Sequence, residues 1–456
     1  MEIKQILELV EREKINFIDL KVVDLWGRWR HVTLARTNFS EKTFVEGIGF
    51  DASNLGYAKV SNSDMILLPD PQTAIIEEFG EEKVLSMICD VHDAITGEPS
   101  LHDPRNILKQ TLKSIKEIAD YVYFVPEYEF HIFEDVKYSI TNNDISVKID
   151  SSEGFWNAEK RGEYFIGKKR GYHRIPPFDT LMEVRNKIVN KLLEYGVPVK
   201  YHHHEVGSCQ VEIELNFVDA LKAADYTLLV KYVARQVAKD YGFVVTFMPK
   251  PLYDEAGNGM HVHQFLTKNG ENIFNGEKIY NLSDTALSYI AGLLKHANSV
   301  MAFTNPSTNS YRRLVPGFEA PTNAVFALAN RTAAIRIPAY VKDSKKRRIE
   351  FRTIDASCNP YLAFSAMILA GIDGIRKNLD PTKEGFGPFE GDAYKENIKP
   401  LAPSLDAALF ALEKDNEYLK TFPKELLEHW INEKYKELRK INSVPHPKEF
   451  ENYFDV

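Results

Sequence analysis

The sequence contains 456 residues, 44% of them hydrophobic and 27% charged, and carries a formal net charge of −8 at pH 7. This length and composition predict a folded chain with a sizeable core, organised as two domains or as one large domain and one small one. The acidic balance argues against nucleic acid as the main partner, because basic residues occur only in short patches.

Cysteine usage and the apolar runs bear on the expected location. Cys89, Cys209 and Cys358 are isolated in the sequence, so neither a disulfide framework nor a thiolate zinc site is indicated. The first residues lack an apolar signal core, and the longest apolar run, about 362 to 372, is too short to cross a bilayer. We therefore expect a cytoplasmic protein without a membrane partner.

The first hundred residues predict a small α+β domain. A helix and two strands are expected over residues 3–13, 17–23 and 30–34. Asp103 and Pro104 then mark the start of another helix, because Asp can cap a helix and Pro fits its first turn. These signals place a domain boundary near residue 100, with domains over 1–100 and 101–456.

Beyond this boundary, amphipathic helices are predicted to alternate with short strands. Gly196 and Gly242 follow two of these helices directly, at the position where glycine commonly ends a helix. The expected helices span residues 179–195, 218–241, 283–300, 360–378, 405–413 and 424–440.

Four short segments alternate apolar and ionisable residues with a period of two. They are 126–131, 210–215, 260–263 and 348–352. Successive side chains of a strand point to opposite faces, so each segment would gather its charged groups on one face. Those groups are carboxylates, imidazoles and guanidiniums without lysine, which favours a polar cavity over the alternative of four solvated sheet faces.

Most of these ionisable residues suit hard divalent cations. Mg²⁺ and Mn²⁺ prefer oxygen ligands and tolerate an imidazole. Clustered carboxylates also need cations to offset their mutual repulsion. The candidate ligands are Glu127, Glu129, Glu205, Glu212, His261 and Glu350.

Three other features are weaker candidates. Adjacent histidines point to alternate faces of a strand, so at most two of His202, His203 and His204 could converge, and a zinc site made of histidines alone is disfavoured. The segment 162–169 lacks the hydroxyl that a phosphate-binding loop requires. The turn-rich stretch 305–321 carries an acid near its end and is either a lid or a packed surface loop.

In order and spacing, these motifs resemble glutamine synthetase of the bacterial and archaeal type over nearly the whole chain. The matching stretches include 49–51, 63–71, 126–130, 202–205, 246–251, 259–263, 309–321, 330–338, 348–352 and 359–362. The resemblance implies an α+β fold with a β-grasp-like N-terminal domain and a larger catalytic domain, whose curved antiparallel sheet is flanked by helices. It also implies a dodecamer of two hexameric rings, with active sites between subunits.

The resemblance further implies ATP-dependent ligation of glutamate and ammonia to glutamine through a γ-glutamyl phosphate intermediate. Two to three Mg²⁺ or Mn²⁺ ions would bind in each active site. Glu129, Glu205 and Glu212 would hold one ion. Glu127, His261 and Glu350 would hold another.

The same resemblance assigns the remaining residues to substrates. Arg313 and Gly257 would bind glutamate, and Arg331 and Arg352 the transferring phosphoryl and γ-carboxyl groups. Asp51, from the adjacent subunit, and Glu319 would bind ammonium and help to deprotonate it. The nucleotide would contact Phe217, His263, Arg336, Lys345 and Arg348.

Two positions depart from the usual family pattern near the acceptor. Ala256 stands where an Asn is common, and Ala52 where a Gly is common. They leave open a γ-glutamyl ligase that uses an organic amine, such as a polyamine or ethanolamine, whereas Asp51 and Glu319 favour ammonium. A catalytically silent relative is less favoured, because the metal and arginine set is complete.

Overall fold

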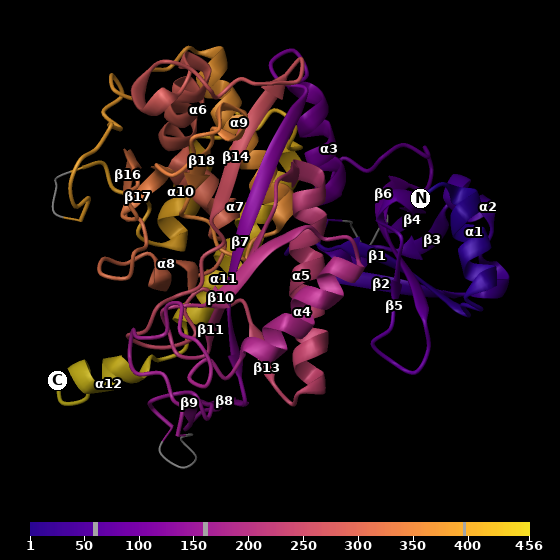
Figure 1. Ribbon diagram of the computed structural model, residues 1–456, viewed down its shortest axis with the longest axis horizontal. Coiled ribbons are helices and arrows are strands. Elements are labelled where there is room, and N and C mark those ends of the chain that lie inside the picture. The colour runs from indigo at the N-terminus through magenta and orange to yellow at the C-terminus, as the bar shows by residue number, and fades with distance from the viewer. Residues whose placement is uncertain (58–62, 158–162, 395–397) are drawn as a thin grey trace.

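A small N-terminal unit lies beside a larger body in which helices cover a long sheet (Figure 1). The computed structural model describes residues 1–57, 63–157, 163–394 and 398–456. Gly162, the first residue of the rejected phosphate-loop segment, lies outside them. Within these described ranges, every helix is too short or too polar to cross a membrane.

The N-terminal unit is built on a sheet with the strand order β2-β1-β6-β4-β3, to which β5 adds by pairing with β6. Strands β1 and β6 run parallel, whereas the other neighbours are antiparallel. The expected first helix and two strands are confirmed to within a residue or two. The elements are α1 (Ile3–Arg12), β1 (Phe17–Val23), β2 (Trp29–Ala35), α2 (Glu41–Val45), β3 (Ile48–Asp51), β4 (Asp64–Pro69), β5 (Ile75–Glu77) and β6 (Val84–Asp93).

The turn between β1 and β2 contacts the larger body by main chain. Gly27 has a φ of 77°, and a Cβ added there would lie 2.6 Å from the Cα of Asn359. The Asn359 side chain donates to the carbonyls of Asp24 and Leu25, both at 3.1 Å. Only glycine therefore fits at this joint.

A buried ion cluster forms a second link between the two units. Arg105, at the start of α3 (Pro104–Ser114), donates to Asp225 at 3.0 and 2.9 Å, to Asp90 at 2.6 Å and to Asp70 at 2.8 Å. Asp70 and Asp90 belong to the N-terminal unit and Asp225 to α5 (Ala220–Asp240). These four residues are called the Arg105 cluster below.

The larger sheet has the strand order β10-β11-β7-β14-β18-β17-β16, with β12 and β13 on β7 and β15 on β14. Its neighbours are antiparallel except for the parallel pair β16 and β17. The expected fold class is confirmed. The strands are β7 (Tyr121–Phe133), β10 (Val199–His204), β11 (Gln210–Leu215), β12 (Val218–Asp219), β13 (Val244–Thr246), β14 (Val262–Lys268), β15 (Glu271–Asn272), β16 (Asn323–Leu328), β17 (Ala333–Ile337) and β18 (Ile349–Phe351).

The prediction of one continuous helix over 283–300 was wrong, because the chain forms two helices there. His296 separates them, and its ring bonds to Asp373 and Asp415, both at 2.9 Å, which explains why the bend is held. The helices of this unit are α4 (Met182–Glu194), α6 (Asp284–Lys295), α7 (Ala297–Thr304), α8 (Ser310–Arg313), α9 (Pro360–Arg376), α10 (Leu405–Lys414), α11 (Lys424–Asn442) and α12 (Pro447–Tyr453).

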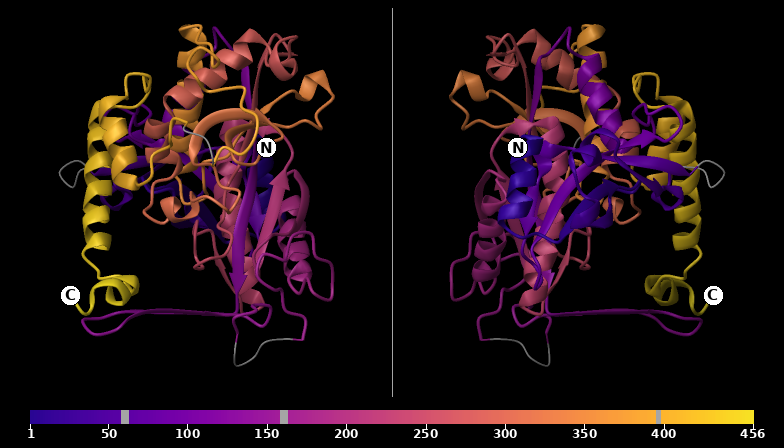
Figure 2. Two further views of the ribbon diagram at one scale, coloured as in Figure 1. Left: turned by 90° about the vertical axis from the view of Figure 1, so that its left-hand side faces the viewer. Right: turned by 90° about the vertical axis from the view of Figure 1, so that its right-hand side faces the viewer.

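A two-stranded hairpin stands off the body near the C-terminal helix (Figure 2). It is formed by β8 (Asp135–Ile140) and β9 (Ile145–Asp150), which pair only with each other among the described strands. Tyr138, Ile140 and Val147 on it are exposed.

Candidate functional site

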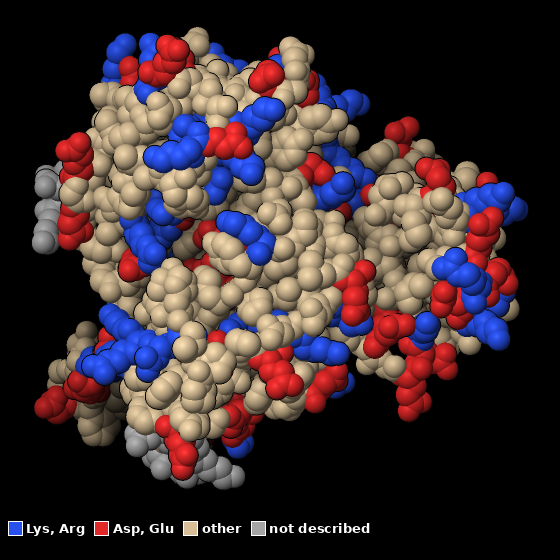
Figure 3. Space-filling view, viewed as in Figure 1, with Lys and Arg blue, Asp and Glu red and all other residues tan. Residues whose placement is uncertain are grey.

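A cavity of about 950 Å³ opens over the larger sheet, and most of the expected site residues line it. On the face in Figure 3, basic side chains surround a hollow in which acidic atoms are visible. The expected residues on its wall are Glu127, Glu129, Glu205, Glu212, Gly257, His261, Arg313, Glu319, Arg331, Arg336, Glu350 and Arg352.

Strand register explains why carboxylates far apart in sequence meet here. Glu212 on β11 lies opposite Glu129 on β7, and the Glu127 backbone N–H donates to the His261 carbonyl at 2.9 Å. Their neighbours Tyr128 and Ile213 point to the other face, into the core. The alternation in sequence thus becomes one acidic face and one apolar face.

One group of acids has few positive partners. Ligand atoms of His203, Glu205 and Glu212 lie within 4.8 Å of one another, with His203 Nε2 3.3 Å from Glu212 Oε1. Burial, together with the charge of nearby Glu129, raises the pKa of Glu205 well above its usual range. Burial and the charges of Glu127 and Glu129 do the same for the pKa of Glu212. Two carboxylates here therefore resist ionisation.

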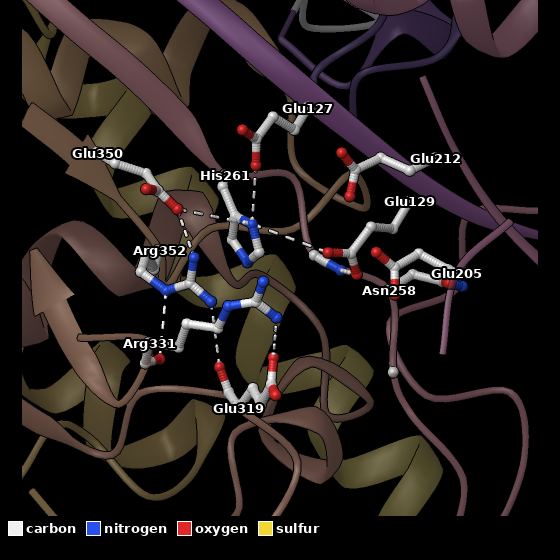
Figure 4. A network of polar contacts seen from close by, with 12 residues as sticks. Glu127, Glu129, Glu205, Glu212, Asn258, His261, Glu319, Arg331, Glu350 and Arg352 are labelled. Carbon is white, nitrogen blue, oxygen red and sulfur yellow. Dashed lines mark hydrogen bonds and ion pairs between the residues drawn. The ribbon is translucent and has the colours of Figure 1, made fainter. Parts of the chain in front are cut away.

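A second group is balanced by arginines. Ligand atoms of Glu127, His261 and Glu350 lie within 4.8 Å of one another, and His261 Nδ1 is 3.1 Å from Glu127 Oε2 (Figure 4). Arg336 and Arg352 both donate to Glu350. Burial opposes ionisation of Glu350, but the charges of Arg352, His263 and Arg336 together outweigh it and lower the pKa to about 2.

Both groups fit divalent cations. Each offers carboxylate oxygens and one imidazole nitrogen close enough together to coordinate a single ion, which is a donor set that Mg²⁺ and Mn²⁺ accept. The raised pKa values of Glu205 and Glu212 show that the first group lacks compensating charge. A bound cation would supply it.

Glu129 was expected in the first group, and the structure gives it a different set of partners. Its Oε2 accepts from the Gly259 backbone N–H at 2.7 Å, and its Oε1 lies 3.8 Å from His261 Nδ1. Glu129 thus lies between the two groups, as Figure 4 shows.

Arg313 is held rigidly at one end of the cavity. It is buried, its Nη2 donates to the carbonyls of Thr353 and Ile354, and burial lowers its pKa. Gly257 packs against it, because a Cβ there would lie 2.7 Å from Arg313 Cγ. The close approach explains why glycine occupies this position.

The segment 305–321 contributes part of the wall. It contains α8, and its residues Gly317, Phe318, Glu319 and Ala320 line the cavity. Glu319 has an unusual positive φ of 56°; its Oε2 accepts from Arg331 at 2.6 Å and its carbonyl from Arg352 at 3.2 Å (Figure 4). Two arginines thus connect this segment to the sheet.

Two of the expected nucleotide residues, Arg336 and His263, lie at the cavity or contact its wall, and two others, Phe217 and Arg348, lie beside it. Arg336 lines the cavity and His263 Nε2 lies 2.8 Å from Glu127 Oε1. The Arg348 guanidinium lies over Phe217 at 5.2 Å and beside Tyr340, which lines the cavity.

Two expected residues lie elsewhere in this chain. Lys345 is on an exposed turn outside the cavity wall. Asp51 ends β3 in the N-terminal unit and lines a separate hollow with Arg30 and His31. Neither joins the other site residues within one chain.

Several residues of the wall were not predicted from the sequence. Lys169, Tyr172, Lys200, Tyr201 and His203 line the cavity. Only His203 carried a signal, through its place in the run of three histidines, of which His204 instead points to Glu153 at 2.8 Å. The lysines come from connecting segments or an edge strand, where no periodic pattern marks them.

Comparisons with known proteins agree over the whole chain. The family model described as glutamine synthetase, beta-grasp domain, matches residues 14–94, and that described as glutamine synthetase, catalytic domain, matches residues 101–453. The chain is 43% identical over 467 residues to glutamine synthetase of Aquifex aeolicus and 44% identical over 475 residues to that of Frankia alni, with 99% of each chain covered.

Solved structures show the same likeness. The chain aligns with the cryo-EM structure of Plasmodium falciparum glutamine synthetase at a TM-score of 0.93 and 28% identity, covering 99% of both chains. The ligand-free structure of GmaS aligns at a TM-score of 0.84 and 26% identity, again over 99% of both.

Proposed function

Because this chain belongs to the glutamine synthetase family, and is therefore an ATP-dependent ligase of glutamate and ammonia, we propose how the residues of its cavity divide that reaction. The observation that carries the proposal is the pairing, in one cavity, of two acid–imidazole groups with a set of arginines. Phosphoryl transfer requires positioning and charge neutralisation more than covalent help, and these groups supply both.

The family uses ATP and divalent metal ions, and we propose Mg²⁺ or Mn²⁺, two to three per site. Glu129, Glu205 and Glu212 would hold one ion. Glu127, His261 and Glu350 would hold the other, and His203 is added to the first set on the basis of its 3.3 Å contact with Glu212. When bound, the ions would neutralise phosphate oxygens of ATP.

Arginines of the cavity wall would bind the anionic parts of the substrates. Arg313 and the backbone at Gly257 would hold the glutamate α-carboxylate, since this guanidinium is buried and fixed by carbonyls. Arg331 and Arg352 would neutralise the transferring phosphoryl group, and Arg336 the nucleotide phosphates. A planar guanidinium suits such oxyanions because it donates two parallel hydrogen bonds.

The nucleotide would lie along an aromatic surface beside the cavity. Phe217 and Phe265 are in edge contact with ring centroids 4.8 Å apart, and Phe265 stacks on Tyr123 at 5.0 Å. Arg348, over Phe217, would reach the phosphates from this side. Lys345 would join only at the outer edge of the bound nucleotide.

Glu319 would bind ammonium and accept a proton from it. Its carboxylate lies at the cavity wall in an ion pair with Arg331. Asp51 would complete this site from an adjacent subunit, because it lies away from the cavity of its own chain.

We also propose domains over 1–100 and 101–456, a dodecamer of two rings, and a cytoplasmic location.

The acceptor is the part of the reaction to test first. Phosphate release from ATP and glutamate would be measured with ammonium, methylamine, ethanolamine and spermidine at equal concentrations. We expect amines to support turnover about 100-fold less efficiently than ammonium, because their bulk would displace Asp51 and Glu319. Higher turnover with an amine than with ammonium would instead favour the organic-amine ligase, for which the small Ala256 at the wall leaves room.

Variants would then locate the ammonium site. Glu319→Gln should raise the KM for ammonium while leaving the KM for ATP close to the wild-type value. Asp51→Asn should have the same selective effect. If either variant altered only the KM for ATP, its assignment to the acceptor would be wrong.

A further inference from the structure

A second cavity, of about 550 Å³, lies where the turn between β1 and β2 meets α5 and the segment before α8. It shares no lining residue with the site cavity described above. Its wall therefore combines the N-terminal unit with the larger body. The catalytic proposal uses none of its residues.

The charges on this wall are unbalanced. Four basic side chains and one acidic side chain line it. The acid, Glu437, forms an ion pair with Lys434 at 2.8 Å. The other three bases, Arg28, Lys231 and Arg235, form no ion pair with any carboxylate in the described part of the chain. Three basic groups therefore share one cavity without a carboxylate in ion-pair distance in the described part of the chain.

Lys231 shows the energetic cost of this arrangement. Only 9% of the residue is exposed, and its Nζ donates to the Ala356 carbonyl at 2.7 Å. Burial, with the nearby charges of Arg235 and Arg28 adding to it and those of Cys358 and Asp355 opposing it, lowers the Lys231 pKa to about 8. A buried cation beside like charges is destabilising unless an anion offsets it.

Arg235 has a similar environment. Burial, and then the charge of Arg28, lowers its pKa. Its Nη1 donates to the Lys231 carbonyl at 3.3 Å, and its guanidinium lies 5.4 Å from the centre of the Phe247 ring. These contacts orient the guanidinium but leave its charge uncompensated.

We propose that this second cavity is a binding site for a small oxyanion, a phosphate or carboxylate group, held by Arg28, Lys231 and Arg235. Guanidinium and ammonium groups together recognise such oxyanions. Trp26, Trp29 and other aromatic side chains on the wall would contact the rest of the ligand.

The position of this oxyanion cavity suits an effector. Ala356, whose carbonyl Lys231 binds, is four residues from Arg352 in the site cavity. Asn309, on the second wall, directly precedes α8, which carries Arg313. A bound anion would thus contact segments that also position two arginines of the catalytic proposal.

Tryptophan fluorescence offers a readout specific to this cavity. Two of the four tryptophans, Trp26 and Trp29, line it, and none lines the site cavity. The full-length protein would be titrated with sodium phosphate and, separately, with sodium chloride at matched ionic strength. We expect a saturable change with phosphate only, with a dissociation constant on the order of millimolar.

Two variants test the basic residues. Arg235→Gln and Lys231→Met should each weaken phosphate binding about ten-fold, which corresponds to the loss of one charge-assisted contact. Lys239→Gln, also on α5 but absent from the cavity wall, is the matched control and should bind like wild type. Circular dichroism would establish that each variant is folded, and Arg235→Gln alone suffices should Lys231→Met not fold.

A parallel titration with succinate would separate the two sources of the oxyanion. Succinate binding that weakens in Arg235→Gln would assign the cavity to carboxylates, and binding of phosphate alone would assign it to phosphate esters. The absence of a saturable change with either anion would overturn the proposal. So would a change that Arg235→Gln leaves unaltered.

Discussion

The Arg105 cluster and the acid group of Glu205 and Glu212 both gather ionisable side chains in the interior. They differ in how far positive groups compensate their carboxylates. In the first, one guanidinium and the Lys109 ammonium face three aspartates, and this outweighs burial enough to lower the pKa of Asp90. In the second, His203 is the only basic group in ion-pair distance of these acids among the described residues. Compensated charges link the two units, whereas the uncompensated acids are those that we propose as cation ligands.

The largest expected effect comes from Glu212→Gln, which would remove one of the two acids whose ionisation is opposed by burial and like charges. Turnover should fall on the order of 1,000-fold, because charge stabilisation at the reacting groups is lost. The thermal midpoint of the metal-free protein should nevertheless rise by several degrees, since a buried repulsion disappears. Paired activity and thermal unfolding measurements would check this.

Glu271→Gln, on the exposed β15, serves as the control and should change neither quantity. A lower thermal midpoint in metal-free Glu212→Gln would contradict the view that repulsion in this group is uncompensated.

The second effect concerns the compensated cluster. Arg105→Met should cost about 3–5 kcal/mol of unfolding free energy, because it leaves the buried Asp225 and the partly buried Asp70 and Asp90 without their shared cation. Lys109→Met, which loses one partly exposed contact to Asp90, should cost less than about 1 kcal/mol. Urea unfolding of both variants would measure the difference, and equal costs would refute the special role of Arg105.

Metal removal should separate the two clusters directly. Adding Mn²⁺ at about 100 times its dissociation constant should stabilise the apoprotein by about 2.7 kcal/mol per site that binds only the folded chain. Arg105→Met should keep this increment, whereas Glu212→Gln should lose much of it. Thermal scans with and without a chelator would decide, and an equal loss in both variants would count against separate roles.

The smallest effect is a pH dependence near the compensated cluster. Burial, and then the charge of Asp90, raises the pKa of Asp103 from 3.8 to about 7. Between these two values the folded chain binds more protons than the unfolded chain, so this group lowers stability as pH rises through that window.

Asp103→Asn should remove this slope. Between pH 5 and 6.5, its unfolding free energy should fall less steeply with pH than that of wild type, by up to about 1.4 kcal/mol per pH unit. Urea midpoints at several pH values would measure the slope. Identical slopes would mean that Asp103 is ionised in the folded chain at these pH values.

Much of the fold, and the shared face of the acidic residues on β7 and β11, could be predicted from the sequence, because local periodicity determines them. The alternation around Glu127 and Glu212 indicated which side chains share a face, and the family motifs indicated the curved antiparallel sheet. Lys169 and Tyr172 could not be predicted, since their place on the wall depends on how connecting segments fold across the sheet. The break at His296 was also missed, because it is held by Asp373 and Asp415, which are distant in sequence.

The joint at Gly27 has a consequence for assembly. The Gly27 backbone closely approaches Asn359, whose side chain donates to the Asp24 carbonyl, and these contacts restrict the relative angle of the two units at this point. In a closed ring, each protomer would pass any angular error to the next, so the errors would add around the circle and prevent it from closing. The absence of a Cβ atom at Gly27 in each chain would then contribute to the geometry of the whole ring.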